Sequence, residues 1–105
     1  MTIDDVMAGL QEHVDRMRDA RARVPEPVDW YLYDILANLH HVNALLEGDE
    51  RDLDRLAGGR PVADIGAADG DLAFTLEAAC GWDVDIVDNA STNMNRLRAA
   101  AALKE

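Results

Sequence analysis

Apolar residues in the first 24 positions recur alternately four and three residues apart, the spacing of one stripe along an amphipathic helix. The members of this stripe are Ile3, Met7, Leu10, Val14 and Met17. Thr2 is placed to cap the helix, with Asp5 three residues later as its partner in a capping box. The pattern therefore predicts a helix over residues 2–24. Its narrow stripe suits packing onto the same chain, which we favour, or self-association into a homo-oligomer.

A second helix is expected over residues 30–47, after two prolines, Pro25 and Pro27, end the first one. Asp29 is its expected cap and Gly48 its expected end. The apolar positions that form its buried face are Leu32, Ile35, Leu36, Leu39, Val42 and Leu46.

A short third helix is expected from Asp49 to the pair Gly58–Gly59, carrying Leu53 and Leu56. Residues 1–59 are thus predicted to form a helical N-terminal extension.

The pattern changes after residue 60 to short apolar runs separated by glycines. The expected elements are a strand at 61–65, a turn at 66–70, a helix at 72–80, a strand at 82–88, and a helix that begins at Ser91 or Thr92 and contains Met94, Leu97, Ala101 and Leu103. A strand–helix–strand–helix order of this kind predicts two parallel strands joined by a right-handed crossover. The fold class is therefore α/β, with residues 60–105 as a first βαβα unit.

Composition narrows the classes of function. The chain has 105 residues, 49% of them apolar, which suffices for one folded domain. No apolar run approaches the roughly 18 residues that cross a bilayer, and the N-terminus lacks a secretory signal. Cys80 is the single cysteine, which fits a reducing cytoplasm. The formal net charge of -11 argues against non-specific binding of nucleic acid.

The candidate chemistry lies at the ends of the two expected strands. Asp64 ends the first strand, and Gly66 and Gly70 frame a tight turn whose middle residues, Ala67 and Ala68, are small. Asp88 ends the second strand and can accept hydrogen bonds from ribose hydroxyls. Two carboxylates beside the turn disfavour a pyrophosphate, and so NAD, and favour a ligand that carries an ammonium and a sulfonium.

The stretch from Val62 to Gly70 resembles the first motif of class I S-adenosylmethionine-dependent methyltransferases, an acid-tipped strand followed by G-x-G-x-G. Ala68 departs from this motif, where a middle glycine is common. The resemblance implies that Asp64 and the backbone of Gly66 hold the methionine end of S-adenosylmethionine, that Asp88 holds the ribose, and that Asn89 and Ala90 lie near the adenine.

Residues 29–105 are similar to a bacterial branch of these enzymes, with tRNA-uridine-modifying members and members that methylate oxygens of small molecules or sugars. The resemblance implies a helical lid before the sheet, whose candidate residues are Tyr31, Tyr33, His40 and His41. It also implies a Rossmann-like sheet of about six or seven strands. The chain then corresponds to the N-terminal portion of such an enzyme, with an incomplete sheet and no activity alone.

The expected reaction is methyl transfer to an oxygen of a small polar acceptor such as a sugar hydroxyl, and the sequence identifies no general base. A tRNA-modifying methyltransferase is one alternative. Another is a non-catalytic interaction module that completes the sheet of a partner. His40 and His41 are adjacent and cannot share a helix face, so we expect no metal site. Asp69 and Asp71 are explained equally well as acids at a helix start.

Overall fold

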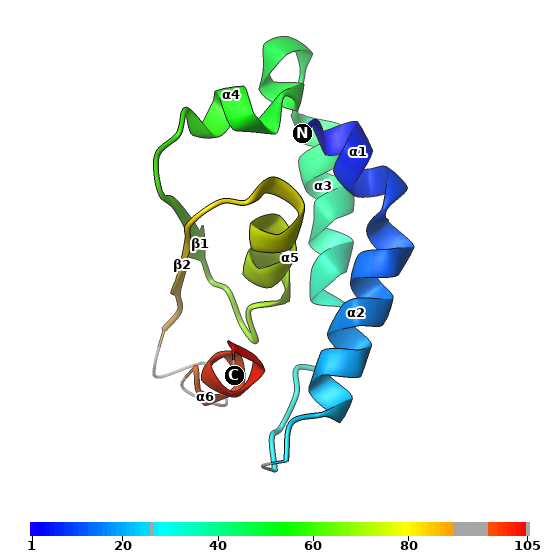
Figure 1. Ribbon diagram of the computed structural model, residues 1–105, viewed down its shortest axis with the longest axis vertical. Coiled ribbons are helices and arrows are strands. Elements are labelled where there is room, and N and C mark those ends of the chain that lie inside the picture. The colour runs from blue at the N-terminus through cyan, green and yellow to red at the C-terminus, as the bar shows by residue number, and fades with distance from the viewer. Residues whose placement is uncertain (26, 90–96, 105) are drawn as a thin grey trace.

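The computed structural model describes residues 1–25, 27–89 and 97–104. In chain order, its elements are α1 (Ile3–Ala8), α2 (Leu10–Ala22), the 3-10 helix η1 (Ile35–Ala37), α3 (Asn38–Leu45), the 3-10 helix η2 (Gly48–Arg51), α4 (Leu53–Ala57), β1 (Val62–Ile65), α5 (Asp71–Cys80), β2 (Val84–Val87) and α6 (Arg98–Lys104). The expected α/β class is confirmed. In Figure 1, α5 lies between the sheet and the helices of the N-terminal half, and it contacts both β2 and η1.

The first helix begins as predicted but is divided in two. The Thr2 side chain accepts a hydrogen bond from the amide of Asp5, and the Asp5 carboxylate accepts one from the amide of Thr2, which completes the capping box. Gly9, with φ -95° and ψ 9°, ends α1 and starts α2. The prediction of one continuous helix over 2–24 is therefore wrong at Gly9, where glycine's low helix propensity favours a break.

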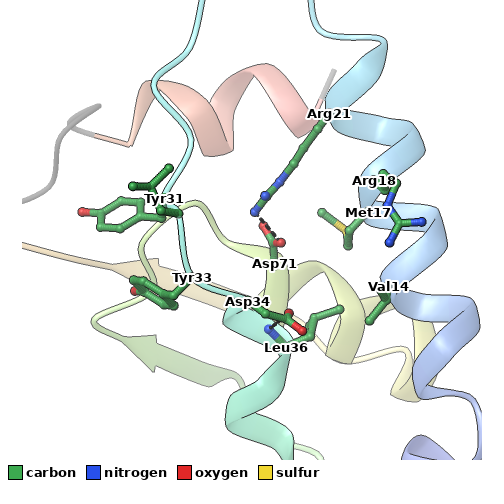
Figure 2. A pocket seen from close by; sticks show the side chains of 10 residues that line it. Val14, Met17, Arg18, Arg21, Tyr31, Tyr33, Asp34, Leu36 and Asp71 are labelled. Atoms are coloured by element: carbon green, nitrogen blue, oxygen red, sulfur yellow. Dashed lines mark hydrogen bonds and ion pairs between the residues drawn. The ribbon is translucent and has the colours of Figure 1, made fainter.

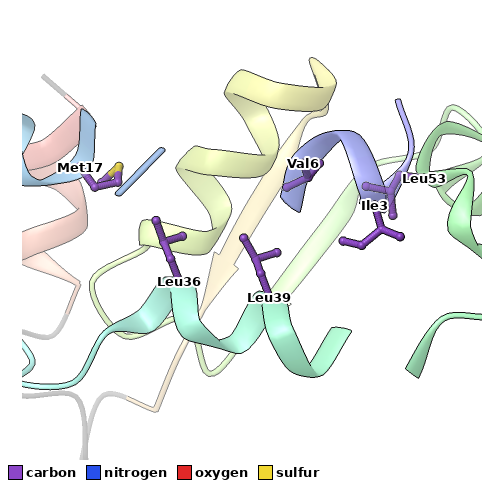
Figure 3. Close-up of a cluster of buried hydrophobic side chains, with 6 residues drawn as sticks. All are labelled: Ile3, Val6, Met17, Leu36, Leu39 and Leu53. Atoms are coloured by element: carbon purple, nitrogen blue, oxygen red, sulfur yellow. The ribbon is translucent and has the colours of Figure 1, made fainter. Parts of the chain in front are cut away.

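The apolar stripe of the first two helices is used inside the chain. Figure 3 shows the buried core that it enters, which consists of Ile3, Val6, Met17, Leu36, Leu39 and Leu53. Met7, Leu10 and Val14 pack against this core, and so do Phe74 and Leu103 from the C-terminal half. The favoured intrachain use of the stripe is confirmed, and the helical extension and the βαβα unit share one core.

The second predicted helix starts five residues later than expected. Its first turn is η1, capped by Asp34, whose carboxylate accepts a hydrogen bond from the amide of Leu36 at 3.1 Å. Residues 30–34 are not helical, and Leu32 is fully exposed instead of buried. The amide of Tyr31 donates to the Asp69 carboxylate, so a tertiary hydrogen bond holds this stretch outside the helix. The α-helix ends at Leu45, and Gly48 begins η2 instead of ending α3.

The third predicted helix is confirmed as a short helical segment in two pieces, η2 and α4. Asp52 caps α4 through the amide of Arg55, and Gly58 ends α4 in the left-handed conformation at φ +62°. Leu53 is buried in the core, whereas Leu56 is half exposed.

The two strands pair in parallel, as predicted, with Val62 opposite Val84 and Ile65 opposite Val87. One face of this sheet carries side chains that are partly covered, and it faces α5. On the other face Ile65 is 74% exposed and Val87 45% exposed. The last helix includes Ala101 and Leu103 as expected, but its predicted cap, Ser91 or Thr92, and Met94 lie outside the described residues.

Within the described ranges, no helix has the length and apolar character needed to cross a bilayer.

We predict that Leu39→Ala lowers the free energy of unfolding by about 2–5 kcal/mol, because it leaves a cavity in the shared core. Urea unfolding followed by circular dichroism measures the change. Leu45→Ala is the matched control on the same helix, since Leu45 is 77% exposed, and it should change stability by less than about 0.5 kcal/mol. Equal effects of the two substitutions would contradict the placement of the core.

Candidate functional site

The turn between β1 and α5, which we call the glycine loop (residues 66–70), has a backbone that only small residues tolerate. Gly66, Ala68 and Gly70 have φ values of +75°, +53° and +91°. A Cβ atom on Gly70 would lie 3.0 Å from the Ile86 side chain. At Gly66 a Cβ would meet nothing within 4 Å, so the backbone there borders open space. The loop is thus packed at its end and accessible at its start.

Ala68 has a left-handed backbone at φ +53°, a conformation that glycine adopts more readily than alanine. A left-handed conformation costs an alanine about 1–2 kcal/mol. Here the amide of Ala68 donates to Oδ2 of Asp88 at 2.8 Å, which helps to hold the loop in this conformation. The amides of Gly66 and Ala67 both donate to the carbonyl of Val87, at 2.7 and 3.2 Å. The loop is therefore bound to the end of β2, where the carboxyl ends of parallel strands meet.

Asp88 lies against the glycine loop, as the sequence predicted. Its Oδ2 accepts from Ala68, and its Oδ1 accepts a hydrogen bond from the amide of Asn89 at 2.8 Å. These two hydrogen bonds from the backbone position the Asp88 carboxylate against the glycine loop.

Asp64 ends β1 with a half-buried carboxyl group on the side of the sheet that faces α5. Its Oδ2 is buried and has no hydrogen-bond partner among the described residues. Burial and the negative charge of Asp88 raise the pKa of Asp64, and a hydrogen bond from the backbone of Ala73 offsets this in part. The carboxylates of Asp64 and Asp88 thus approach the same loop, and the hydrogen bond from Ala73 compensates the charge of Asp64 only in part.

A second pair of acids, Asp69 and Asp71, is buried at the start of α5, at 0% and 5% exposure. The guanidinium of Arg21, on α2, forms an ion pair and a hydrogen bond with Asp71 and lies 3.7 Å from Asp69. Burial raises the pKa of Asp71, and Arg21 lowers it in part. Arg21 also lies over the ring of Trp30, 5.1 Å from its centroid. These groups connect the helical half to the glycine loop.

No local pattern of residues indicates this network. Arg21 resembled a cation that favours a helix C-terminus, and the two acids resembled residues that favour a helix N-terminus. Fifty residues separate Arg21 from Asp71. A pairing over that distance has no local spacing that a single sequence reveals.

Tyr31 and Tyr33, the aromatic lid candidates, lie next to the loop. The amide of Tyr31 donates to Asp69 at 2.9 Å, and the two rings meet edge to face with centroids 5.6 Å apart. The pKa of Tyr33 is raised by burial first, then by Tyr31 and by the charges of three carboxylates, Asp69, Asp88 and Asp71. Figure 2 shows both rings on the side of the pocket opposite Met17 and Val14 of α2.

The structure thus brings together the predicted cofactor residues Asp64, Gly66, Ala67, Ala68, Gly70, Asp88 and Asn89 with Tyr31 and Tyr33. Ala90, expected near the adenine, lies outside the described residues. His40 and His41 are exposed on α3, and the structure records no hydrogen bond or ion pair between either one and the loop. In the described part of the chain, no three His, Cys, Asp or Glu side chains are grouped to hold a metal ion.

Comparison with protein-family models, with curated proteins and with solved structures gives no match to this chain.

We predict that Asp64→Asn raises the melting temperature of the ligand-free protein at neutral pH. The pKa of Asp64 is raised in the folded state, so stability falls as the pH rises from the unfolded pKa to the folded one, and the loss is complete above the folded pKa. Below the pKa of the unfolded chain, about 3.9, the carboxyl is protonated in both states and the difference should disappear. Thermal unfolding between about pH 3 and pH 8 measures it.

Asp85→Asn is the control for this substitution, because Asp85 is exposed and lies between Val84 and Ile86 of the same sheet. A lower melting temperature for Asp64→Asn than for Asp85→Asn at neutral pH would contradict the assignment of an uncompensated carboxylate.

Proposed function

We propose that the glycine loop binds S-adenosylmethionine and that the protein is a class I methyltransferase. One observation carries this proposal. At the carboxyl edge of a parallel sheet, the Asp64 and Asp88 carboxylates lie near the backbone of Gly66, which borders open space. Ligands of α/β proteins bind at this edge.

The charge of the site selects among nucleoside ligands. Asp64 has a buried oxygen without a partner, and Asp88 acts on it as a like charge. A pyrophosphate next to these two groups would add to the repulsion. A ligand with an ammonium and a sulfonium supplies the missing positive charge, and charge-assisted hydrogen bonds are the stronger kind. The site therefore fits S-adenosylmethionine better than NAD.

The resemblance to class I methyltransferases supplies the role of each residue. Asp64 and the Gly66 backbone hold the methionine end. Asp88 holds the ribose hydroxyls, and Asn89 lies beside the adenine. Tyr31 and Tyr33, next to the loop, belong to a lid that keeps water from the site. When bound, S-adenosylmethionine supplies an electrophilic methyl group.

The acceptor in this proposal is an oxygen of a small polar molecule such as a sugar hydroxyl. A net charge of -11 opposes the approach of a polyanion, so a small neutral acceptor is favoured over tRNA. Residues of this chain contribute by aligning the donor and excluding water, which are the main sources of rate in a displacement of this kind.

A second candidate function rests on the open face of the sheet. Ile65 and Val87 expose apolar side chains there, on strands that pair only with each other in the described part of the chain. An interaction module that completes a partner's sheet would cover this face. Such a module needs no cofactor, so the titration below separates the two functions.

We predict that Asp88→Ala weakens binding of S-adenosylmethionine by about 1–3 kcal/mol, through loss of hydrogen bonds from the ribose to a charged acceptor. Isothermal titration calorimetry of the protein with S-adenosylmethionine, S-adenosylhomocysteine and NAD measures it. Asp85→Ala is the matched control, since Asp85 is an exposed acid on the same strand. Heat from NAD alone, or unchanged affinity in Asp88→Ala, would refute the proposed site.

A further inference from the structure

A cavity of about 340 Å³ lies between α2, the segment 31–36 and the first turn of α5. Cavities that hold small ligands measure about 300–1,000 Å³, so its size suits a small molecule. Figure 2 shows Tyr31 and Tyr33 on one side and Met17 and Val14 on the other. None of the glycine-loop residues lines it. It is therefore a separate site, joined to the loop through the hydrogen bond from Tyr31 to Asp69.

The polar part of the wall is the ion pair of Arg21 and Asp71, and this pair is incompletely satisfied. Arg21 bonds to Oδ2 of Asp71, whereas Oδ1 of Asp71 and Nε of Arg21 are buried and have no partner in the described residues. The Asp71 side chain is only 7% exposed. A buried polar group without a hydrogen-bond partner destabilises the fold. The two side chains that pair at this cavity therefore hold one unmet acceptor and one unmet donor.

A hydroxyl group is both a donor and an acceptor, so hydroxyls satisfy both atoms. The charged groups that line the cavity are two arginines, Arg18 and Arg21, and two aspartates, Asp34 and Asp71. Their formal charges balance, and the net charge of -11 on the chain opposes an anion. Tyr31 and Tyr33 offer aromatic surface for a flat apolar face of the ligand.

We propose that this cavity binds a neutral, hydroxylated small molecule of about the size of a monosaccharide, as the acceptor subsite of the methyl transfer. The acceptor role rests on the proposed function, whereas the binding of the ligand does not. Both unpaired atoms are enclosed by protein, and the ligand reaches them when the Arg21 and Asp71 side chains, which line the cavity, turn toward it.

The test is a titration of ¹⁵N-labelled protein with three neutral probes, methyl glucoside, methyl mannoside and myo-inositol, followed by amide chemical shifts. We expect saturable shifts at Tyr31, Tyr33 and Asp71 with at least one of them, and weaker binding of glucuronate, an anion of matched size. No saturable shift with any neutral probe, or tighter binding of glucuronate, would overturn the proposal.

Two substitutions on α2 provide a matched pair. Val14→Trp fills the cavity and should lower the affinity for the bound probe at least about tenfold, which corresponds to about 1.4 kcal/mol. Asp19→Trp places the same side chain at an exposed position that does not line the cavity and should leave the affinity unchanged. Equal affinity in both variants would place the probe elsewhere.

If Val14→Trp fails to fold, a second pair decides. Tyr33 is half exposed, so its substitution does not open the core. Tyr33→Ala should weaken probe binding about two- to tenfold through loss of the ring, and Tyr33→Phe should retain it. Full affinity in Tyr33→Ala would remove the aromatic wall from the proposal.

The same samples separate this proposal from the proposed function. Titration with S-adenosylhomocysteine should shift the amides of the glycine loop in Val14→Trp as it does in the unmodified protein, and Asp88→Ala should still bind the neutral probe. Probe binding without binding of the nucleoside would leave the cavity assigned and refute the methyl transfer. Nucleoside binding without any probe shift would do the reverse.

Discussion

The contact between Arg21 and the two buried acids at the start of α5 joins the helical half of the chain to the segment around the glycine loop. Asp69 and Asp71 are almost entirely removed from water, and a buried carboxylate without a cation is costly. Arg21 supplies that cation from α2, fifty residues away from Asp71. The helical half therefore does more than cover the sheet: it neutralises the acids at the start of α5, which directly follows the glycine loop.

The two pairs of carboxylates in the molecule differ in their charged partners. Asp69 and Asp71 lie beside the guanidinium of Arg21, and Asp69 also accepts a hydrogen bond from the amide of Tyr31. Asp64 and Asp88 lie close enough to repel each other, and burial together with this repulsion raises the pKa of Asp64. The ionised form of Asp64 therefore makes the fold less stable at that point. Such local conflicts are expected where a ligand binds.

Much of the fold was predictable because its signals are local. The capping box at Thr2, the left-handed end of α4 at Gly58 and the parallel strands around the glycine loop all follow from neighbours in the sequence. The errors have tertiary causes. Residues 30–34 are not helical, since Tyr31 bonds to Asp69 and Asp34 caps the helix in place of Asp29. Leu32 was expected in the core on helical periodicity, which fails where the helix is absent.

The candidate site, like the fold, has one part that could be predicted from the sequence and one part that could not. The glycine loop and Asp88 were predictable because parallel strands bring their carboxyl ends together. The cavity beside Arg21 was not, because its walls come from three segments distant in sequence. The bond from Tyr31 to Asp69 belongs to both sites, since Tyr31 lines the cavity and Asp69 lies in the loop. A change in the position of Tyr31 therefore changes the support of the glycine loop.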